Sequence, residues 1–327
     1  MELHTDVARQ YADFLAYTGN STCFRAWAEG VLADPEVLAW IAGMPSIKQQ
    51  PNLVFAAARW HGVPAPGPYA GLRDALLSDQ GTIRATILER ATQTNEVGRL
   101  ATLVPFFSAL AREADGPLAL LEVGASAGLC LYPDRFSYEW ETDAGTVAVG
   151  EGPLLRCLVD GVLPEPGSLP AVAWRGGIDL HPLDVTDRDA MDWLSTLVWP
   201  EDDERRQRLG AAVDIARADP ARLITGDLLD ELPELVGEAA ELGRVVVFHS
   251  AVIVYLEPAD RERLVTMMSS LVGAGRCHWV SNEAKQVLPS VTATGPAVPA
   301  DLATFVLGVD GVARAWTHGH GASMTVL

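Results

Sequence analysis

The feature that most constrains this chain is a short apolar run that ends at a glycine turn. Residues 118–123 read LALLEV, and residues 124–128 follow as GASAG. An apolar run of this length before glycines is typical of a strand buried on both faces. The small residues after it favour a turn and then the start of a helix over residues 125–131. The sequence therefore predicts a strand-turn-helix unit inside a parallel sheet.

The chain beyond this unit alternates between strand and helix patterns. Strands are predicted at residues 171–180, 222–224, 244–249 and 277–280, and residues 252–256 extend the third of these apolar runs. Helices are predicted at residues 188–218 with a break near Pro200, at 231–241, and at 261–272 with Pro258 at the start. Alternation of this kind predicts an α/β fold, a mostly parallel Rossmann-like sheet with helices on both faces.

Two further segments complete the expected α/β domain. Short stretches at residues 136–140, 146–149 and 154–159, separated by glycines, indicate a β-rich insertion at about residues 136–170. Their strand pairing stays open. Asp310 and Gly311 separate two apolar stretches and predict a hairpin, since this pair supplies the positive φ angles of a tight turn.

The N-terminal part has a different pattern. From Val7 to about Ala114, apolar residues recur at spacings of three and four, which predicts helices, with an irregular loop at residues 61–71. We therefore expect a helical N-terminal module over residues 1–115 and the α/β domain with its insertion over residues 116–327.

Composition narrows the range of partners. Lysine and arginine total 24 against 43 aspartate and glutamate, so the net charge of −19 disfavours nucleic acid. The four cysteines form no CxxC pair, which favours buried reduced thiols. No basic leader or apolar run of the ~18 residues that a membrane span needs is present. We expect a soluble cytoplasmic protein that acts on a small molecule without a membrane or nucleic-acid partner; the oligomeric state stays open.

The glycine turn is the first candidate for a ligand site. In open parallel sheets, ligands bind beyond the carboxyl ends of the strands, where glycines let the backbone come close. Glu122 precedes Gly124, Ser126 and Gly128 in a pattern unlike the dinucleotide fingerprint GxGxxG. A carboxylate there favours a cationic or amine-bearing ligand such as S-adenosylmethionine over NAD.

Polar residues also follow the later predicted strands: Asp179, Asp227, His249 and Ser250, and Glu283. A second polar group interrupts the helical pattern of the N-terminal part at residues 92–96. Gln93, Asn95, Glu96 and Arg99 fit a polar wall over the pocket, because buried amides and carboxylates need partners. The alternative is a solvated helix end.

Two resemblances bear on these residues. Residues 122–128 resemble the first motif of class I methyltransferases, with Ser126 in place of the usual middle glycine. The chain also resembles a bacterial family of unassigned function through the following strings: TQTNEVGR (92–99), LLEVGASAGL (120–129), RGGIDLHPLDV (175–185) and FHSAVIVYL (248–256).

The methyltransferase resemblance implies a cofactor, S-adenosylmethionine, and roles for individual residues. Gly124, Ser126 and Gly128 would line its methionine moiety, with Glu122 nearby. Asp179 would accept hydrogen bonds from the ribose, unless Asp184 or Asp187 takes that position. Asp227 would bind the adenine amine, and Ser250 is expected on the same side of the pocket.

The chemistry has several candidate residues. Methyl transfer requires an oriented nucleophile and sometimes a base, so His249, Tyr255 and Glu96 are the candidates for catalysis. Gln93, Asn95, Arg99 and Glu283 are the candidates for binding the acceptor. No metal is expected, although His318 and His320 form an HxH pair.

Two rival functions stay open. One is a binding or regulatory protein that keeps the nucleoside pocket without turnover. The other is a serine hydrolase, because residues 124–128 also fit the GxSxG pattern, with Ser126 as the nucleophile and Asp227 and then His249 or His318 following in chain order.

Overall fold

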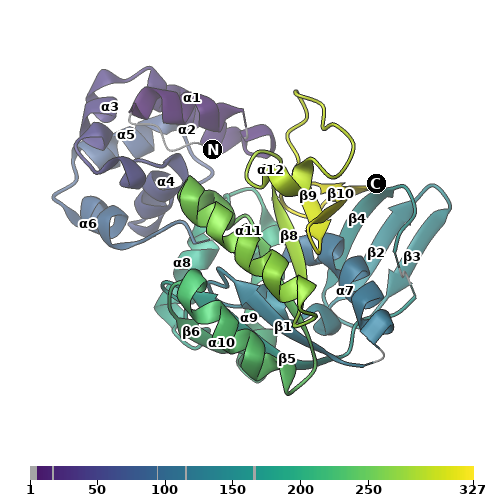
Figure 1. Cartoon of the computed structure of the whole chain (residues 1–327). Coiled ribbons are helices and arrows are strands. Elements are labelled where there is room, and N and C mark those ends of the chain that lie inside the picture. Colours follow the sequence, from purple (N-terminus) through teal and green to yellow (C-terminus); the bar gives the residue numbers. More distant parts are fainter. Residues whose placement is uncertain (1–5, 17, 94, 115, 165–166) are drawn as a thin grey trace. The chain divides into compact units, whose positions relative to one another are not determined.

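The computed structural model describes residues 6–16, 18–93, 95–114, 116–164 and 167–327 (Figure 1). The chain divides into two compact units. One consists of Met1–Thr94 with Asp187–Gly210, and the other of Asn95–Thr186 with Ala211–Leu327. This division differs from the expected one in two segments, because residues 95–114 belong with the sheet and residues 187–210 belong with the helical unit.

The first unit is helical in its described residues, as the spacing of apolar residues predicts. Asp6, Ser21 and Asp34 each accept a hydrogen bond from a backbone N–H of the first turn and so cap a helix. The helices are α1 Val7–Leu15, α2 Thr22–Leu32, α3 Pro35–Ala42, α4 Pro51–Trp60, α5 Tyr69–Leu77, α6 Thr82–Glu89, α8 Arg188–Leu197 and the first half of α9 Asp203–Ala218.

Aromatic rings and one carboxylate attach residues 187–210 to the other helices of this unit. The ring of Trp199 lies 5.8 Å from that of Phe14 and 5.9 Å from that of Phe24. Glu201 accepts hydrogen bonds from the Ser21 hydroxyl at 2.7 Å and the Cys23 N–H at 2.8 Å, at the start of α2. The carboxylate therefore supplements the helix cap.

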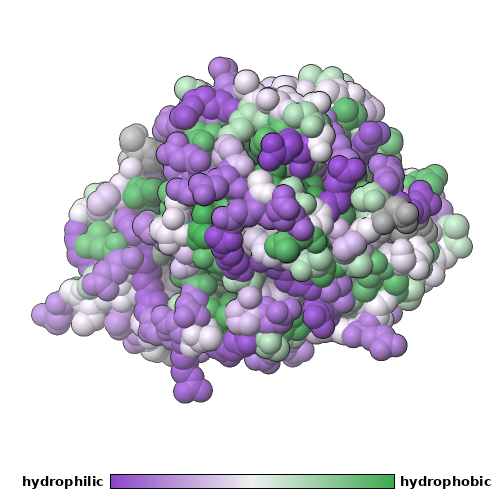
Figure 2. All heavy atoms as spheres, turned by 60° about the horizontal axis from the view of Figure 1, so that its bottom comes forward, coloured by the Kyte–Doolittle hydropathy of each residue, from purple (hydrophilic) through white to green (hydrophobic). Residues whose placement is uncertain are grey.

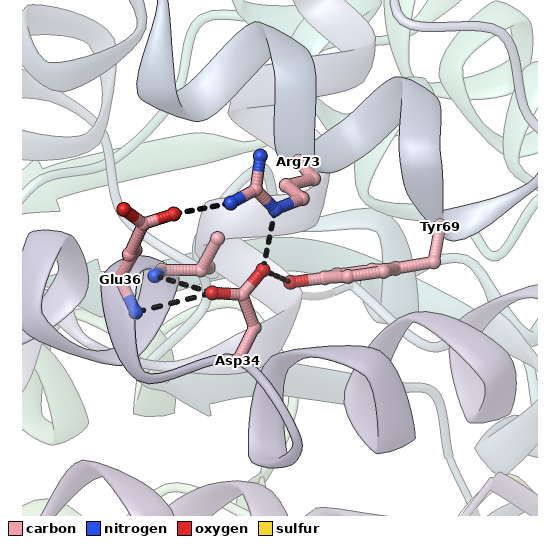
Figure 3. Close-up of polar contacts among 5 residues, drawn as sticks. Asp34, Glu36, Tyr69 and Arg73 are labelled. Carbon is pink, nitrogen blue, oxygen red and sulfur yellow. Dashed lines mark hydrogen bonds and ion pairs between the residues drawn. The ribbon is translucent and has the colours of Figure 1, made fainter.

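A polar cluster connects α3 and α5 (Figure 3). The Asp34 carboxylate accepts the N–H groups that begin α3 and also hydrogen bonds from Tyr69 Oη at 3.2 Å and Arg73 Nε at 2.7 Å. Arg73 pairs with Glu36 as well. A Cβ on Gly30 would overlap the Tyr69 ring, so a glycine is needed where α2 passes this tyrosine.

The second unit is built on one mixed sheet. Its spatial order is β3-β2-β4-β11-β10-β9-β8-β7-β1-β5-β6. The strands are β1 Leu118–Val123, β2 Ser137–Thr142, β3 Gly145–Val149, β4 Leu154–Asp160, β5 Val172–Asp179, β6 Arg222–Thr225, β7 Arg244–Ser250, β8 His278–Ala284, β9 Phe305–Val309, β10 Val312–Thr317 and β11 Ser323–Val326.

Most neighbouring strands of this sheet run parallel. All pairs within β6-β5-β1-β7-β8 are parallel, while β9 runs antiparallel to β8 and begins the predicted hairpin. Asp310 and Gly311 have φ values of 51° and 81°, as the hairpin requires. The predicted insertion, β2 to β4, joins the same sheet through the unpredicted strand β11, which pairs parallel with β4.

Helices lie on both faces of the sheet. α10 (Leu228–Ala240) and α11 (Pro258–Gly273) pack on the face that presents Val245 and Val247 of β7. The opposite face carries α7 (Leu100–Ala114), whose Phe107 ring lies 5.2 Å from that of Phe248. Successive side chains of a strand alternate between faces, so the two packing partners of β7 define an α10/α11 face and an α7 face.

One local prediction is wrong. No α-helix follows the glycine turn: residues 129–131 and 133–135 form single 3₁₀ turns before β2. Gly128 has φ 69°, and Pro133 disfavours helical backbone at Tyr132, so a helix cannot propagate there. The apolar run after β7 does not continue as strand either, because Ala251 turns to φ 59° and Ile253–Tyr255 forms another 3₁₀ turn.

The prediction of buried reduced thiols is confirmed. The four cysteines are free and buried. In the described part of the chain no helix is long and apolar enough to cross a bilayer. On the face drawn in Figure 2, hydrophilic residues cover much of the surface, with apolar residues in small groups between them. The short helix α12 (Pro289–Thr292) completes the second unit.

Candidate functional site

The carboxyl ends of β1 and β7 mark the point where the direction of strand addition changes. From β1 the chain adds β5 and then β6 on one side, and it returns to add β7 and then β8 on the other. In open α/β sheets the crevice at such a switch point is the usual ligand position. Glu122, Ser250 and Glu283 lie near the ends of β1, β7 and β8.

The glycine turn uses its own N–H groups within the protein. Gly124, Ser126 and Gly128 all have positive φ, at 68°, 51° and 69°. The N–H of Gly124 donates to the Ile178 carbonyl at 2.8 Å, and that of Ser126 donates to Asp179 Oδ2 at 2.8 Å. Because no helix follows, the turn also lacks the free N–H groups of a helix start.

Asp179 and Asp227, the predicted ligands of the nucleoside, accept hydrogen bonds from backbone N–H groups instead. Both oxygens of Asp179 accept N–H groups, from Ser126 at 2.8 Å and from His181 at 2.8 Å. Asp227 is exposed and caps α10 by accepting the Leu229 N–H at 2.8 Å. Each carboxylate stabilises a turn or a helix start, and this geometry favours neither as a ribose or adenine ligand.

Glu122 is different, because its carboxylate is buried without a full set of partners. Glu122 is 8% exposed and Ser126 5% exposed. Glu122 Oε2 and Ser126 Oγ are both buried and have no hydrogen-bond partner. Burial raises the pKa of Glu122 well above its ordinary value; the nearby Arg99 charge opposes this shift and Asp179 adds to it. A donor is thus missing beside the glycine turn.

Arg99 provides the positive charge on the same side. Its Nε donates to the Gly319 carbonyl at 2.8 Å, and a terminal nitrogen donates to the Ser250 carbonyl at 3.0 Å. Backbone packing brings the Gly319 loop close: a Cβ on Gly321 or on Gly98 would overlap the backbone of the other segment. Gly98 and Gly321 therefore allow a close approach of the two segments.

The predicted polar wall is partly buried. Glu96 is 2% exposed and accepts the Gly98 N–H at 3.1 Å, while the Cys130 thiol donates to the Glu96 carbonyl at 3.7 Å. Asn95 accepts the Leu129 N–H at 3.0 Å. The segment from Asn95 to Arg99 is therefore turned inward, as the polar-wall interpretation predicts. Gln93 belongs to the other compact unit, so only part of the predicted wall lies with the sheet.

A polar chain at the ends of β7, β8 and β10 adds residues that sequence reasoning missed. Asn282 donates to Ser250 Oγ at 3.0 Å and accepts from Thr317 Oγ1 at 2.7 Å. Asn282 and Thr317 are buried. The only sequence signal for them is that each is polar at the end of an apolar strand, and only the pairing of the strands brings them together.

His249 and Glu283 form a separate buried pair on the other face. His249 shares its face with Val247, and Glu283 shares its face with Trp279, which puts both on the α10/α11 side. His249 Nδ1 lies 2.7 Å from Glu283 Oε1, and Trp279 Nε1 donates to His249 Nε2 at 3.0 Å. Nε2 is thus the acceptor and Nδ1–H the donor. With both nitrogens engaged, this geometry favours a structural role for His249 over proton transfer.

Three predictions remain: Tyr255 as a catalytic residue, His318 and His320 as an HxH pair, and Ser126 as a hydrolase nucleophile. Tyr255 is 69% exposed, at the end of the turn that follows β7. The rings of His318 and His320 lie 5.6 Å apart, yet no group of three metal-binding side chains exists among the described residues. For a hydrolase, Ser126 has the positive φ of a strained nucleophile, but its hydroxyl has no hydrogen-bonded base.

The comparisons with known proteins identify a family. A family model described as "Uncharacterized protein conserved in bacteria (DUF2332)" matches residues 7–325. No curated protein matches the chain.

Proposed function

We propose that this chain, which belongs to the bacterial DUF2332 family, binds S-adenosylmethionine and transfers its methyl group to a small molecule. One observation carries the proposal: Glu122 Oε2 and Ser126 Oγ are buried without partners beside a glycine turn at the switch point of a parallel sheet. A ligand that donates hydrogen bonds and carries positive charge would complete this arrangement.

The Glu122 carboxylate would gain stability from a hydrogen-bond donor. Leaving a buried polar group without a hydrogen bond costs about 1–3 kcal/mol, and more for a charged group. An ammonium group beside Glu122 would satisfy the carboxylate and favour its ionised form. S-adenosylmethionine offers an amine and a sulfonium in one molecule, so it matches the acidic side chain better than an uncharged nucleoside.

The strand order supports the same ligand class. The order β6-β5-β1-β7-β8 corresponds to 3-2-1-4-5, the start of the doubly wound order, with the glycine turn after its first strand. The antiparallel neighbour β9 distinguishes this sheet from a fully parallel one. We propose a methyltransferase-like arrangement of the core on this basis.

The roles of individual residues follow from their contacts. Glu122 and Ser126 would bind the amine, and Arg99, attached to the Gly319 and Ser250 carbonyls, would bind a carboxylate of the ligand or acceptor. The sulfonium supplies a reactive methyl group when the ligand is bound. The protein's contribution is then mainly orientation of the acceptor.

The first experiment is calorimetric titration with S-adenosylmethionine and S-adenosylhomocysteine. Glu122→Gln keeps the shape and removes the charge, so it is expected to weaken binding by about tenfold or more, in line with ~1.5–3 kcal/mol for a hydrogen bond to a charged group. Glu151→Gln, an exposed residue of the same unit, is the matched control. Absence of heat and of thermal stabilisation with the unaltered protein at millimolar ligand would remove the proposal.

A binding protein without turnover is the remaining rival, and it uses the same residues. Incubation with labelled S-adenosylmethionine and a broad panel of small nucleophiles separates the two functions. Binding without transfer to any acceptor would favour the rival.

A further inference from the structure

One carboxylate oxygen of β8 binds two backbone N–H groups of the turn after β7. Glu283 Oε1 accepts the N–H of Val252 at 3.0 Å and that of Ile253 at 3.2 Å. The same oxygen lies 2.7 Å from His249 Nδ1, and Trp279 orients His249 from the other side. These contacts offset the left-handed backbone of Ala251, which costs about 1 kcal/mol or more for a residue other than glycine.

The same turn brings Val252 against the glycine turn. A Cβ on Gly124 would overlap both methyl groups of Val252, so the valine lies directly on the Gly124 backbone. Val252 is half-buried, whereas Val254, two residues on, is exposed. The glycine at position 124 is thus required by a protein side chain that packs directly on it.

We infer that Val252 is a specificity-determining residue: its size sets how much of a ligand the glycine turn admits, and Glu283 with His249 fixes its position. This inference rests on the proposed function, in which the ligand lies along residues 124–128. It also gives the buried His249–Glu283 pair a role, because the pair positions the residue that meets the ligand without touching the ligand itself.

Residue 252 is therefore expected to select ligands by size, whereas Glu122 interacts with their charge. The amine of the ligand interacts with Glu122, on the α7 face, whereas the nucleoside must pass Val252 beside Gly124. A smaller residue at position 252 is therefore expected to favour S-adenosylmethionine over methionine, which carries the same amine and no nucleoside. A larger residue at position 252 is expected to favour methionine over S-adenosylmethionine.

The test is calorimetric titration of three variants with S-adenosylmethionine and with methionine. Val252→Ala is expected to raise the affinity for S-adenosylmethionine about tenfold and Val252→Leu to lower it about tenfold, the range that a methylene difference produces in a tight pocket. The affinity for methionine is expected to stay unchanged. Val254→Ala is the control, and thermal unfolding of each variant checks that it is folded.

A second pair of variants tests the positioning role. Glu283→Gln keeps an oxygen that can accept the Val252 and Ile253 N–H groups and is expected to preserve the affinity ratio of the two ligands. Glu283→Ala removes this accepting oxygen. The ratio of its affinities for S-adenosylmethionine and methionine is expected to move toward the ratio of the Val252→Ala variant. Unchanged ratios in both Val252 variants would overturn the inference and leave the proposed function intact. No binding of S-adenosylmethionine by any variant would remove the proposed function and the inference with it.

Discussion

At the residue scale, the most informative side chain is Glu122. One oxygen of its carboxylate is buried without a partner, as is the hydroxyl of Ser126 in the turn that follows, and the charges of Arg99 and Asp179 act on the carboxylate. A buried polar group without a partner calls for an explanation, and a bound ligand is one. Glu122 therefore points to a ligand more directly than the glycines of the turn do.

The pH dependence of stability gives a test of Glu122 that needs no ligand. Its pKa is raised in the folded state, so the folded protein holds a proton that the unfolded chain releases once the pH exceeds the ordinary pKa of 4.5. The contribution of Glu122 to stability is full below that value and is lost as pH rises toward the folded pKa. The Glu122→Gln variant does not titrate, so its stability advantage over the unaltered protein is expected to grow with pH, by up to ~1.4 kcal/mol per unit.

Chemical denaturation of both proteins between pH 5 and pH 8 measures this difference. Parallel stability curves for the two proteins would show that Glu122 is ionised in the folded state.

At the scale of elements, caps and turns explain why two predicted ligands have structural roles. Asp227 stands at the N-terminus of α10, and Asp179 joins β5 to the glycine turn. A carboxylate after a strand is as suitable for capping the next helix as for binding a ligand. Position along the chain cannot distinguish the two uses, whereas hydrogen-bond partners can.

Substitution of Asp227 tests this assignment. Asp227→Ala is expected to reduce the free energy of unfolding by about 1 kcal/mol through loss of the α10 cap, with unchanged affinity for S-adenosylmethionine. Asp227→Asn retains a capping oxygen and is expected to restore stability. If titration calorimetry showed weaker S-adenosylmethionine binding in a stable Asp227→Asn protein, Asp227 would be a nucleoside ligand.

At the scale of the whole molecule, the chain leaves the sheet unit and comes back to it. Residues 187–210 lie between β5 and β6 in sequence, yet they pack with the helices of Met1–Thr94. Within that helical unit, Trp199 joins the aromatic core and Glu201 caps α2. A segment inserted within the α/β part of the sequence therefore completes the helical unit.

Removing the cap tests how much this segment contributes. Glu201→Ala eliminates the hydrogen bonds to the Ser21 hydroxyl and the Cys23 N–H, with an expected loss of about 1–3 kcal/mol in unfolding free energy. Glu204→Ala, on the exposed side of α9, removes only an i,i+4 pair with Arg208 and is expected to change stability by less than about 0.5 kcal/mol. Equal urea midpoints for the two variants would contradict the role of Glu201.

The sequence by itself determined the features that depend on near neighbours. Strand β1 ends where LALLEV ends, α11 begins at Pro258, and Asp310 with Gly311 makes the hairpin, because burial patterns, caps and turn angles are local. Only the tertiary structure decided which polar residues meet. Strand pairing sets Ser250 beside Asn282, and side-chain alternation puts His249 and Glu122 on opposite faces although each lies near the end of an apolar strand. These outcomes depend on register between distant segments, which no local pattern encodes.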